Sequence, residues 1–272
     1  MTATVPGMCS VQTGPALLAF PPGCRVARLL RREKRFTAIT VDPDTGEQLR
    51  AHTNNTGSML GLLRPGAPAL LSPAQNPDRA LKWTLEALGL PQSQPNAPTA
   101  WAGVNTLTPN RLLAAAWRAG HLPEARAYAR MTPEAKTGDS RLDARFDPAP
   151  DKGLPTLFVE CKNVTLVEDD QAQFPDAASE RGRKHLDELI RLKREGCRTA
   201  LFFLVQRPDG RCFAPAEVVD PAYAEGLARA LSAGVEAWVW RARVEPAGPH
   251  AGIHLAERLP LAPTWAKFAE RA

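Results

Sequence analysis

Short runs of strand-forming residues, separated by turn signals, fill the first third of the chain. From 36 to 41, Phe, Ala and Thr alternate with Thr, Ile and Val, and the run ends in Asp-Pro-Asp-Thr-Gly at 42–46, a turn-forming sequence. Further apolar runs follow at 67–71 and 81–85. Short strands with frequent Gly, Pro and Asn between them are typical of a small barrel. We therefore predict a small β-barrel over residues 16–95.

A proline-rich segment separates this region from the rest of the chain. Residues 89–98 hold three prolines in ten positions and few side chains that could be buried. Such a composition is typical of a linker. It predicts a domain boundary, with a second domain over residues 96–272.

After the linker the apolar spacing changes to that of helices and buried strands. Thr108 followed by Pro109 is typical of a helix start, with Thr as the N-cap. The apolar run at 198–206 has the length of a buried central strand. The predicted elements are a helix from 108, strands over 128–136, 141–146 and 156–162, a helix over 177–195, a strand over 198–206, a helix from Asp220-Pro221 to near Gly234, and a strand over 235–240. This order of helix, three strands, helix and strand predicts an α/β (mixed) domain.

Positive charge is concentrated near the N-terminus. The chain has a formal net charge of +5, and residues 1–95 carry ten Lys and Arg against six Asp and Glu. Six basic residues fall between Arg25 and Arg35. Such a cluster is either a phosphate-facing patch or a solvated strand. The residues expected to follow a phosphate backbone are Arg31, Arg32, Lys34 and Arg35.

Cysteine usage and hydropathy bear on location. The five cysteines are widely scattered and show no zinc-type spacing with histidine. We expect reduced thiols and a cytoplasmic protein. No apolar stretch approaches the ~20 residues that a membrane-spanning helix requires, so no membrane association is expected.

The strand predicted over 156–162 carries candidate metal chemistry. Glu160 and Lys162 are two residues apart and would point to the same side. If the strands over 141–146 and 156–162 pair as a hairpin, Asp143 approaches Glu160. Two convergent carboxylates form an oxygen site suited to Mg²⁺ or Mn²⁺, and Lys162 could orient the attacking water.

The Glu-x-Lys pattern alone is not specific. Glu134-Ala-Lys136 is a second copy, and solvent-exposed strand charges or an ion pair are alternative interpretations. What distinguishes Glu160 is the apolar run before it and an upstream Asp on a neighbouring strand. Glu134 is expected to serve as an accessory metal ligand, because its strand would lie beside the one with Asp143.

Two further segments could contact phosphate. Near the start of the helix over 177–195, the basic residues Arg181, Lys184 and His185 share one side. In the first domain, Asn55 and Ser58 lie in a polar, glycine-containing turn whose amides and hydroxyls could hold a phosphate. The alternatives are a solvated mixed-charge helix face and ordinary turn chemistry.

These segments resemble the sugar fermentation stimulation protein A family over most of the chain. The resemblance rests on many short motifs that occur in order and at family-like separations. They include Asn55-Thr-Gly-Ser-Met59, Leu63-Arg-Pro-Gly66, Gly103-Val-Asn-Thr106 with Pro109-Asn-Arg111, Ser140-Arg-Leu-Asp143, Glu160-Cys-Lys-Asn-Val-Thr165, Phe174-Pro-Asp176, Arg181-Gly-Arg-Lys-His-Leu186 and Val205-Gln-Arg207.

The resemblance implies an oligonucleotide-binding (OB) barrel followed by a PD-(D/E)XK nuclease-like domain. Asp143, Glu160 and Lys162 then match the acid, acid and lysine of the nuclease signature. The chain departs from that signature at Leu142, where a proline is usual, and residues 1–15 resemble a variable extension. Family members are described as DNA-binding proteins linked to sugar-utilisation genes.

The leading hypothesis is a nucleic-acid-binding protein with a Mg²⁺- or Mn²⁺-dependent nuclease site that acts on DNA or RNA. The competing hypothesis is a non-catalytic DNA-binding regulator of sugar utilisation that retains the fold. A small-molecule or nucleotide enzyme is a third class, and no glycine-rich phosphate loop supports it.

Overall fold

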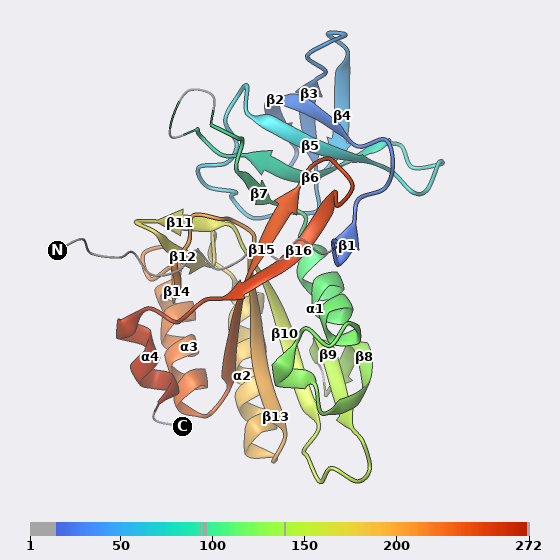
Figure 1. Ribbon diagram of the computed structural model, residues 1–272. Helices are drawn as coiled ribbons and strands as arrows, with labels where there is room; N and C mark the ends of the chain where they lie inside the picture. The colour runs from blue at the N-terminus through green and yellow to red at the C-terminus, as the bar shows by residue number, and fades with distance from the viewer. Residues whose placement is uncertain (1–14, 93, 95–96, 139, 271–272) are drawn as a thin grey trace, which may run out of the picture.

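The fold contains a β-barrel and an α/β domain that lie one above the other in Figure 1. The structure is a computed structural model that describes residues 15–92, 94, 97–138 and 140–270. The extension expected over 1–15 therefore lies, except for Pro15, outside the described residues.

The barrel is a six-stranded sheet in which five strands close on themselves. Its order is β4-β3-β2-β5-β6-β7, and a parallel pairing of β4 with β6 closes the barrel. Buried Leu, Ala and Met side chains fill its interior. The strands are β2 (Arg25–Glu33), β3 (Thr37–Val41), β4 (Gln48–His52), β5 (Pro68–Pro73), β6 (Trp83–Gly89) and β7 (Trp101–Gly103). This confirms the small barrel that the strand spacing predicted and the OB type that the family resemblance implied.

Two short strands cross the domain limits expected from the sequence. β7 lies beyond residue 95, yet it pairs with β6 in the barrel sheet. β1 (Leu18–Ala19) lies within the expected barrel, yet it pairs with β16 (Gly252–Arg258) of the α/β domain. Neither pairing has a local sequence signal, because each strand is very short and its partner is distant in the chain.

The α/β domain is built on a seven-stranded sheet of order β1-β16-β15-β13-β10-β9-β8. β13 (Arg198–Val205) lies between the parallel strands β10 and β15. Both its faces are covered, which explains its continuous apolar run. The other strands are β8 (Tyr128–Thr137), β9 (Ser140–Pro148), β10 (Leu157–Val164) and β15 (Glu236–Glu245).

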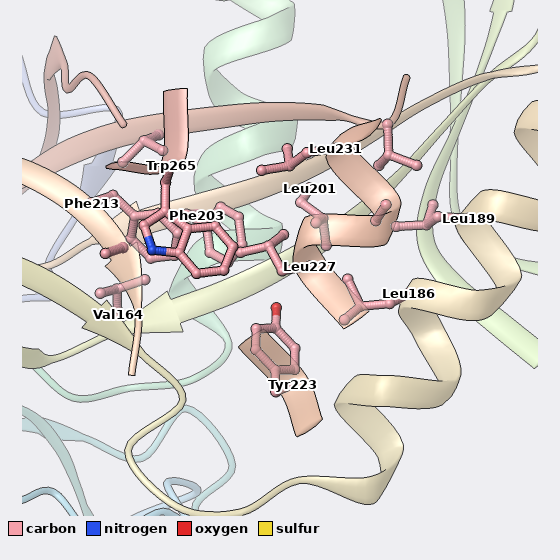
Figure 2. Packing of buried hydrophobic residues seen from close by; sticks show 14 of the residues in the cluster. Val164, Leu186, Leu189, Leu201, Phe203, Phe213, Tyr223, Leu227, Leu231 and Trp265 are labelled. Atoms are coloured by element: carbon pink, nitrogen blue, oxygen red, sulfur yellow. The ribbon is translucent and has the colours of Figure 1, made fainter. Parts of the chain in front are cut away.

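Helices cover both faces of this sheet. α1 (Thr108–Arg118) packs on one face, over a core that includes Phe146 and Phe202. α2 (Glu180–Arg194), α3 (Pro221–Ser232) and α4 (Pro263–Ala269) cover the other. Figure 2 shows Leu186 and Leu189 of α2 beside Leu227 of α3 in this second core. No described helix has the length and apolar character needed to cross a membrane.

Smaller elements complete the domain beside α3. A three-stranded sheet has the order β11-β12-β14, with β11 (Leu166–Glu168), β12 (Gln171–Phe174) and β14 (Cys212–Pro215). A single 3₁₀ turn, Pro123–Ala125, follows α1. The β15–β16 hairpin extends from the large sheet towards the barrel, where β15 contacts β7 (Figure 1).

The starts of two helices differ from the prediction. The N-cap of α1 is Leu107 rather than Thr108, and the amide of Leu107 is bound by the side chain of Asn105. α2 begins at Glu180 rather than 177, because Ser179 is its N-cap and accepts a hydrogen bond from the Gly182 amide. The prediction of α3 from Asp220-Pro221 is confirmed.

Asp220 joins two helix starts. Its carboxylate accepts hydrogen bonds from the amide of Tyr223 at 2.9 Å and from the amide of Ser179 at 2.8 Å, and pairs with Arg183 at 2.9 Å. Burial opposes ionisation, but these amides and Arg183 hold the pKa of Asp220 below its usual value. Asp220 thereby fixes the angle between α2 and α3, and α2 carries part of the candidate site.

We predict that Asp220→Ala lowers the free energy of unfolding by about 3 kcal/mol at pH 7, because two amides and a guanidinium lose their acceptor. Since the folded-state pKa is lowered, this contribution is present at neutral pH and is lost as the pH falls below the ordinary value of 3.8. Urea denaturation at several pH values measures it. Asp187→Ala, which removes an exposed carboxylate of α2, is the control and should change little. An equal effect of both variants would contradict the account.

Candidate metal and nucleic-acid site

The pairing of β9 with β10 brings the two predicted acids together. The last Cα pair between these strands is Val159 with Ala144, so Glu160 and Asp143 are the next residues on each strand. The strands separate there, and the Asp143 carboxylate accepts a hydrogen bond from the Cys161 amide at 2.8 Å. Its other oxygen accepts one from Nδ2 of Asn110 in α1 at 2.7 Å. Asp143 is thus fixed at the point where the hairpin opens.

Glu160 is the centre of a buried charge cluster. Its Oε1 lies 2.7 Å from Nζ of Lys162, and it also contacts Nδ1 of His185 in α2. Glu160 is 3% exposed, and Lys162 and His185 are also buried. On the other side of the ring, Nε2 of His185 lies 3.5 Å from Nε of Arg181. A proton on Nδ1 of His185 satisfies both contacts, since that nitrogen then donates to Glu160 and Nε2 accepts from Arg181.

The pKa values of the two acids are shifted in opposite directions. Burial alone would raise the pKa of Glu160, but Lys162 and His185 lower it to about 2. Burial and the nearby charge of Glu160 raise the pKa of Asp143, against the hydrogen bonds from Cys161 and Asn110. The charge of Glu160 thus acts on Asp143 across the opening between β9 and β10. A cation between them would relieve their repulsion.

The donor set fits a hard divalent cation. Oε2 of Glu160 is buried and accepts no hydrogen bond from any described residue, and Asp143 supplies the second carboxylate. Within the described chain no group of three or more His, Cys, Asp and Glu side chains forms a metal cage. Mg²⁺ commonly binds through one or two carboxylates and completes its shell with water and phosphate oxygens. A two-carboxylate site is therefore sufficient.

A pocket of about 530 Å³ opens beside this cluster. The α/β domain contributes Lys162, the Cys161 backbone and Arg181 to its wall. The barrel contributes Arg35 and part of the barrel loop, which we define as residues 53–59. The candidate site thus faces a pocket that neither domain forms alone.

Hydrogen bonds hold the barrel loop against the α/β domain. The amide of Met59 donates to the Asp176 carboxylate at 2.8 Å, and the Ser58 hydroxyl donates to the Asp176 carbonyl at 2.6 Å. A Cβ atom on Gly57 would lie 2.4 Å from the Asp176 carboxylate, so this close approach requires glycine. Asn54 is bound by Asn105 at 2.7 Å. The pocket wall is therefore fixed at both ends of the loop.

Several residues expected to bind nucleic acid have structural partners instead. Arg31 pairs with Glu33 at 2.6 Å. Arg32 donates to the carbonyl oxygens of Arg35, Asn55 and Gly57, and thereby supports the barrel loop. Asn55 is 5% exposed, and its Oδ1 accepts from the Gly57 amide. The turn-chemistry interpretation therefore fits Asn55, and Ser58 serves the domain contact described above.

The other barrel cations stay available. Lys34 and Arg35 form the turn between β2 and β3 with left-handed φ angles of 47° and 61°. Both are exposed and form no salt bridge with a described residue. Arg35 lines the pocket.

Among the three basic residues of α2 that were expected to contact phosphate, one side chain is also available to a ligand and two have protein partners. Arg181 is exposed and lines the pocket. Lys184 points to solvent and pairs with Glu180 at 2.8 Å, with both side chains about 70% exposed. His185 is buried against Glu160 and orients that carboxylate rather than meeting a ligand at the surface.

Glu134 is not brought into the site. The register places it opposite Asp143, between the pairs Pro133–Ala144 and Ala135–Leu142. Its φ of 48° departs from strand geometry, and its carboxylate is 69% exposed and pairs with Arg141 at 3.1 Å. Adjacent strands predicted proximity, but the local backbone turns this side chain to solvent. Glu134 therefore leaves the proposed metal set.

Sequence reasoning did not single out three residues that shape the site. Asn110 orients Asp143, Asp176 anchors the barrel loop, and Thr56 lines the pocket. Asn110 lies one residue after Pro109, in the first turn of α1. A polar residue at this position of a helix that packs on the sheet could have been predicted to contact the site. Asp176 lies in the family motif Phe174-Pro-Asp176, but its role could not be predicted because its partner is 117 residues away.

We predict that Lys162→Ala lowers the free energy of unfolding by about 3 kcal/mol, because it leaves the buried Glu160 without its countercharge. Urea denaturation in the presence of EDTA measures this. Lys184→Ala removes the same side chain from an exposed Lys–Glu pair and should have little effect. Similar losses in the two variants would show that the Glu160 cluster is not a buried pair.

Comparisons with known proteins agree with this architecture. The SfsA N-terminal OB domain matches residues 30–95, and the sugar fermentation stimulation protein RE domain matches residues 107–248. The sugar fermentation stimulation protein homolog of Maridesulfovibrio salexigens is 53% identical over 246 residues, which cover 90% of this chain and 97% of that protein. The homolog of Syntrophobacter fumaroxidans is 49% identical over 245 residues and covers 90% and 87%.

A solved structure extends the match to three dimensions. Pyrococcus furiosus SfsA, described in complex with Ca²⁺, is 27% identical and superposes with a TM-score of 0.78. The alignment covers 92% of this chain and all of that one. The strand order, the two domain matches and these relatives lead to one conclusion: the chain belongs to the sugar fermentation stimulation protein (SfsA) family.

Proposed function

We propose that the chain is a Mg²⁺- or Mn²⁺-dependent nuclease that hydrolyses phosphodiester bonds of DNA or RNA. The observation that carries this proposal is the buried, unpartnered Oε2 of Glu160 beside Asp143, with Lys162 in the same cluster. The Ca²⁺ complex of Pyrococcus furiosus SfsA supports it, because Ca²⁺ and Mg²⁺ both prefer oxygen ligands.

Asp143 and Glu160 would hold the cation. When bound, it would stabilise negative charge on the phosphate and lower the pKa of a bound water. Asn110 and the Cys161 amide hold Asp143 in place, and His185 orients Glu160. These contacts fix both carboxylates before a ligand arrives, so little reorganisation is required.

Lys162 would position the attacking water. Its ammonium group lies against Glu160 and lines the pocket, so it can reach a water or phosphate oxygen there. Arg181 and Arg35 enter the same pocket from opposite domains. Their guanidinium groups would bind phosphate oxygens of the strand from two sides of the pocket.

The ion pair of Glu160 with Lys162 does not remove either residue from the site. Lys162 is the lysine of the nuclease signature, so the pair joins two members of the proposed site rather than an acid and an unrelated base. Oε2 of Glu160 also has no hydrogen-bond partner among the residues that the structure describes.

The competing role is a DNA-binding regulator of sugar utilisation that does not cleave its ligand; the name of the relatives refers to the stimulation of sugar fermentation. It predicts salt-dependent binding that does not require the acids. The nuclease proposal is preferred because a regulator has no need of the buried Glu160–Lys162–His185 cluster, which is costly to desolvate.

We predict that the purified protein cleaves labelled DNA or RNA oligonucleotides with Mg²⁺ or Mn²⁺ and not with EDTA. Lys162→Met should lower the rate about 100-fold or more, because the positioning of the attacking water is lost. Asp143→Asn, which keeps the shape of the side chain, should also abolish metal-dependent cleavage. Gel electrophoresis of the products measures the rates.

Lys184→Ala is the matched control, because Lys184 is a lysine of the neighbouring helix that lies outside the pocket. It should cleave at the wild-type rate. Binding without cleavage by the wild type, or cleavage that survives in both site variants, would favour the regulator.

A further inference from the structure

The pocket between the domains lies next to the candidate acids. Glu160 is 3% exposed and contacts Lys162, and Lys162 lines the pocket. A phosphate bound in the pocket can therefore meet this cluster at Lys162. In the proposed function, the form of nucleic acid that fits the pocket is the form that is cleaved.

The barrel loop forms one wall of the pocket and cannot easily move aside. Its Met59 amide and Ser58 hydroxyl are bound to Asp176, and Asn54 donates to Asn105 and accepts from the Thr106 amide. Opening the wall requires the loss of these hydrogen bonds together. The opposite wall is α2 with Arg181 and the segment that precedes it.

The volume of the pocket suits one strand. At about 530 Å³ it is in the range of sites that enclose a small-molecule ligand, which is the size of one or two nucleotides. A base-paired duplex is much wider than one strand, because its two strands are separated by grooves about 6–12 Å wide. A pocket of this volume therefore suits one strand better than a duplex.

The number of positive charges in the pocket also favours a single strand as ligand. The cations of the pocket are Arg35, Lys162 and Arg181, whereas proteins that bind duplex DNA commonly contact about 6–10 phosphates over a broad basic surface. Two of the four arginines of β2, Arg25 and Arg31, are paired with acids and add little to the basic surface.

An exposed aromatic side chain lies next to the pocket. Phe36 is 49% exposed and follows Arg35 directly, and its carbonyl accepts a hydrogen bond from the Thr53 amide at the start of the barrel loop. Proteins that bind single strands combine basic groups with aromatic platforms on which unpaired bases stack. Phe36 with Arg35 provides such a combination at the barrel side of the pocket.

From these observations we propose that the pocket accepts an unpaired strand of nucleic acid and excludes a duplex, which makes single-stranded nucleic acid the substrate class of the proposed nuclease. This inference rests on the proposed function for its catalytic part. The strand would lie between the barrel loop and α2, with one phosphate at Lys162 and Arg181 and an adjacent base on Phe36.

The test compares three end-labelled DNA substrates of the same sequence with the wild-type protein and Mn²⁺: a single strand, a blunt duplex, and a duplex with a single-stranded overhang. We expect the single strand and the overhang to be cleaved about 100-fold faster than the blunt duplex, because a paired strand must first be separated. Equal rates on the single strand and the blunt duplex would overturn the inference and leave the nuclease function intact.

If no substrate is cleaved, the nuclease proposal is contradicted. The inference about single strands is then tested by a binding measurement. Fluorescence anisotropy with Ca²⁺ then compares the single strand with the blunt duplex. Tighter binding of the single strand would support the inference without the catalytic function, and equal binding would overturn it.

Two variants test whether the pocket causes the preference for single strands. Thr56→Trp places an indole in the pocket and should weaken single-strand binding about tenfold, because it introduces a clash. Its control is Thr45→Trp, on the exposed turn between β3 and β4 and outside the pocket. Asp176→Ala releases one anchor of the barrel loop and should raise duplex cleavage relative to single-strand cleavage. No change in either variant would show that the pocket does not select the substrate.

Discussion

The interaction on which the site depends is the contact of the Glu160 carboxylate with the Lys162 ammonium group in the interior of the protein. Two charges removed from water are tolerated only when each is closely paired and hydrogen bonded. The cluster meets this requirement with His185 on one side and leaves one carboxylate oxygen of Glu160 without a partner. The pairing fixes the acid, and the proposed cation site uses the remaining oxygen.

The two domains meet where this chemistry lies. The α/β sheet supplies the acids at the point where β9 and β10 separate, and the barrel supplies a wall through its loop. Asp176 joins the two parts, because its side chain and its carbonyl both bind the barrel loop. The barrel therefore forms part of the pocket beside the candidate site.

Much of this arrangement could be predicted from the sequence, because it depends on local periodicity. Side chains two residues apart on a strand face the same side, which placed Glu160 beside Lys162. The apolar run of β13 indicated a strand covered on both faces, and the order of elements indicated the α/β domain. The expected hairpin between β9 and β10 is present, and it puts Asp143 and Glu160 at adjacent positions on neighbouring strands.

The parts that could not be predicted depend on distant or unusual backbone. The position of Arg32 in a basic run indicated phosphate binding, but its guanidinium reaches carbonyl oxygens 23 and 25 residues away. Glu134 lay on the expected strand, and a single left-handed residue conformation turned it to solvent. In both cases residue type was a poor guide, because the partner was set by the tertiary fold rather than by sequence spacing.

The central claim is that Asp143 and Glu160 form a cation site, and anomalous diffraction from crystals soaked in Mn²⁺ tests it most directly. The account predicts an anomalous peak between the two carboxylates, at the pocket end of β9 and β10, that is lost in Asp143→Asn crystals. A peak elsewhere, with the two acids unchanged and Oε2 of Glu160 still without a ligand, would contradict it.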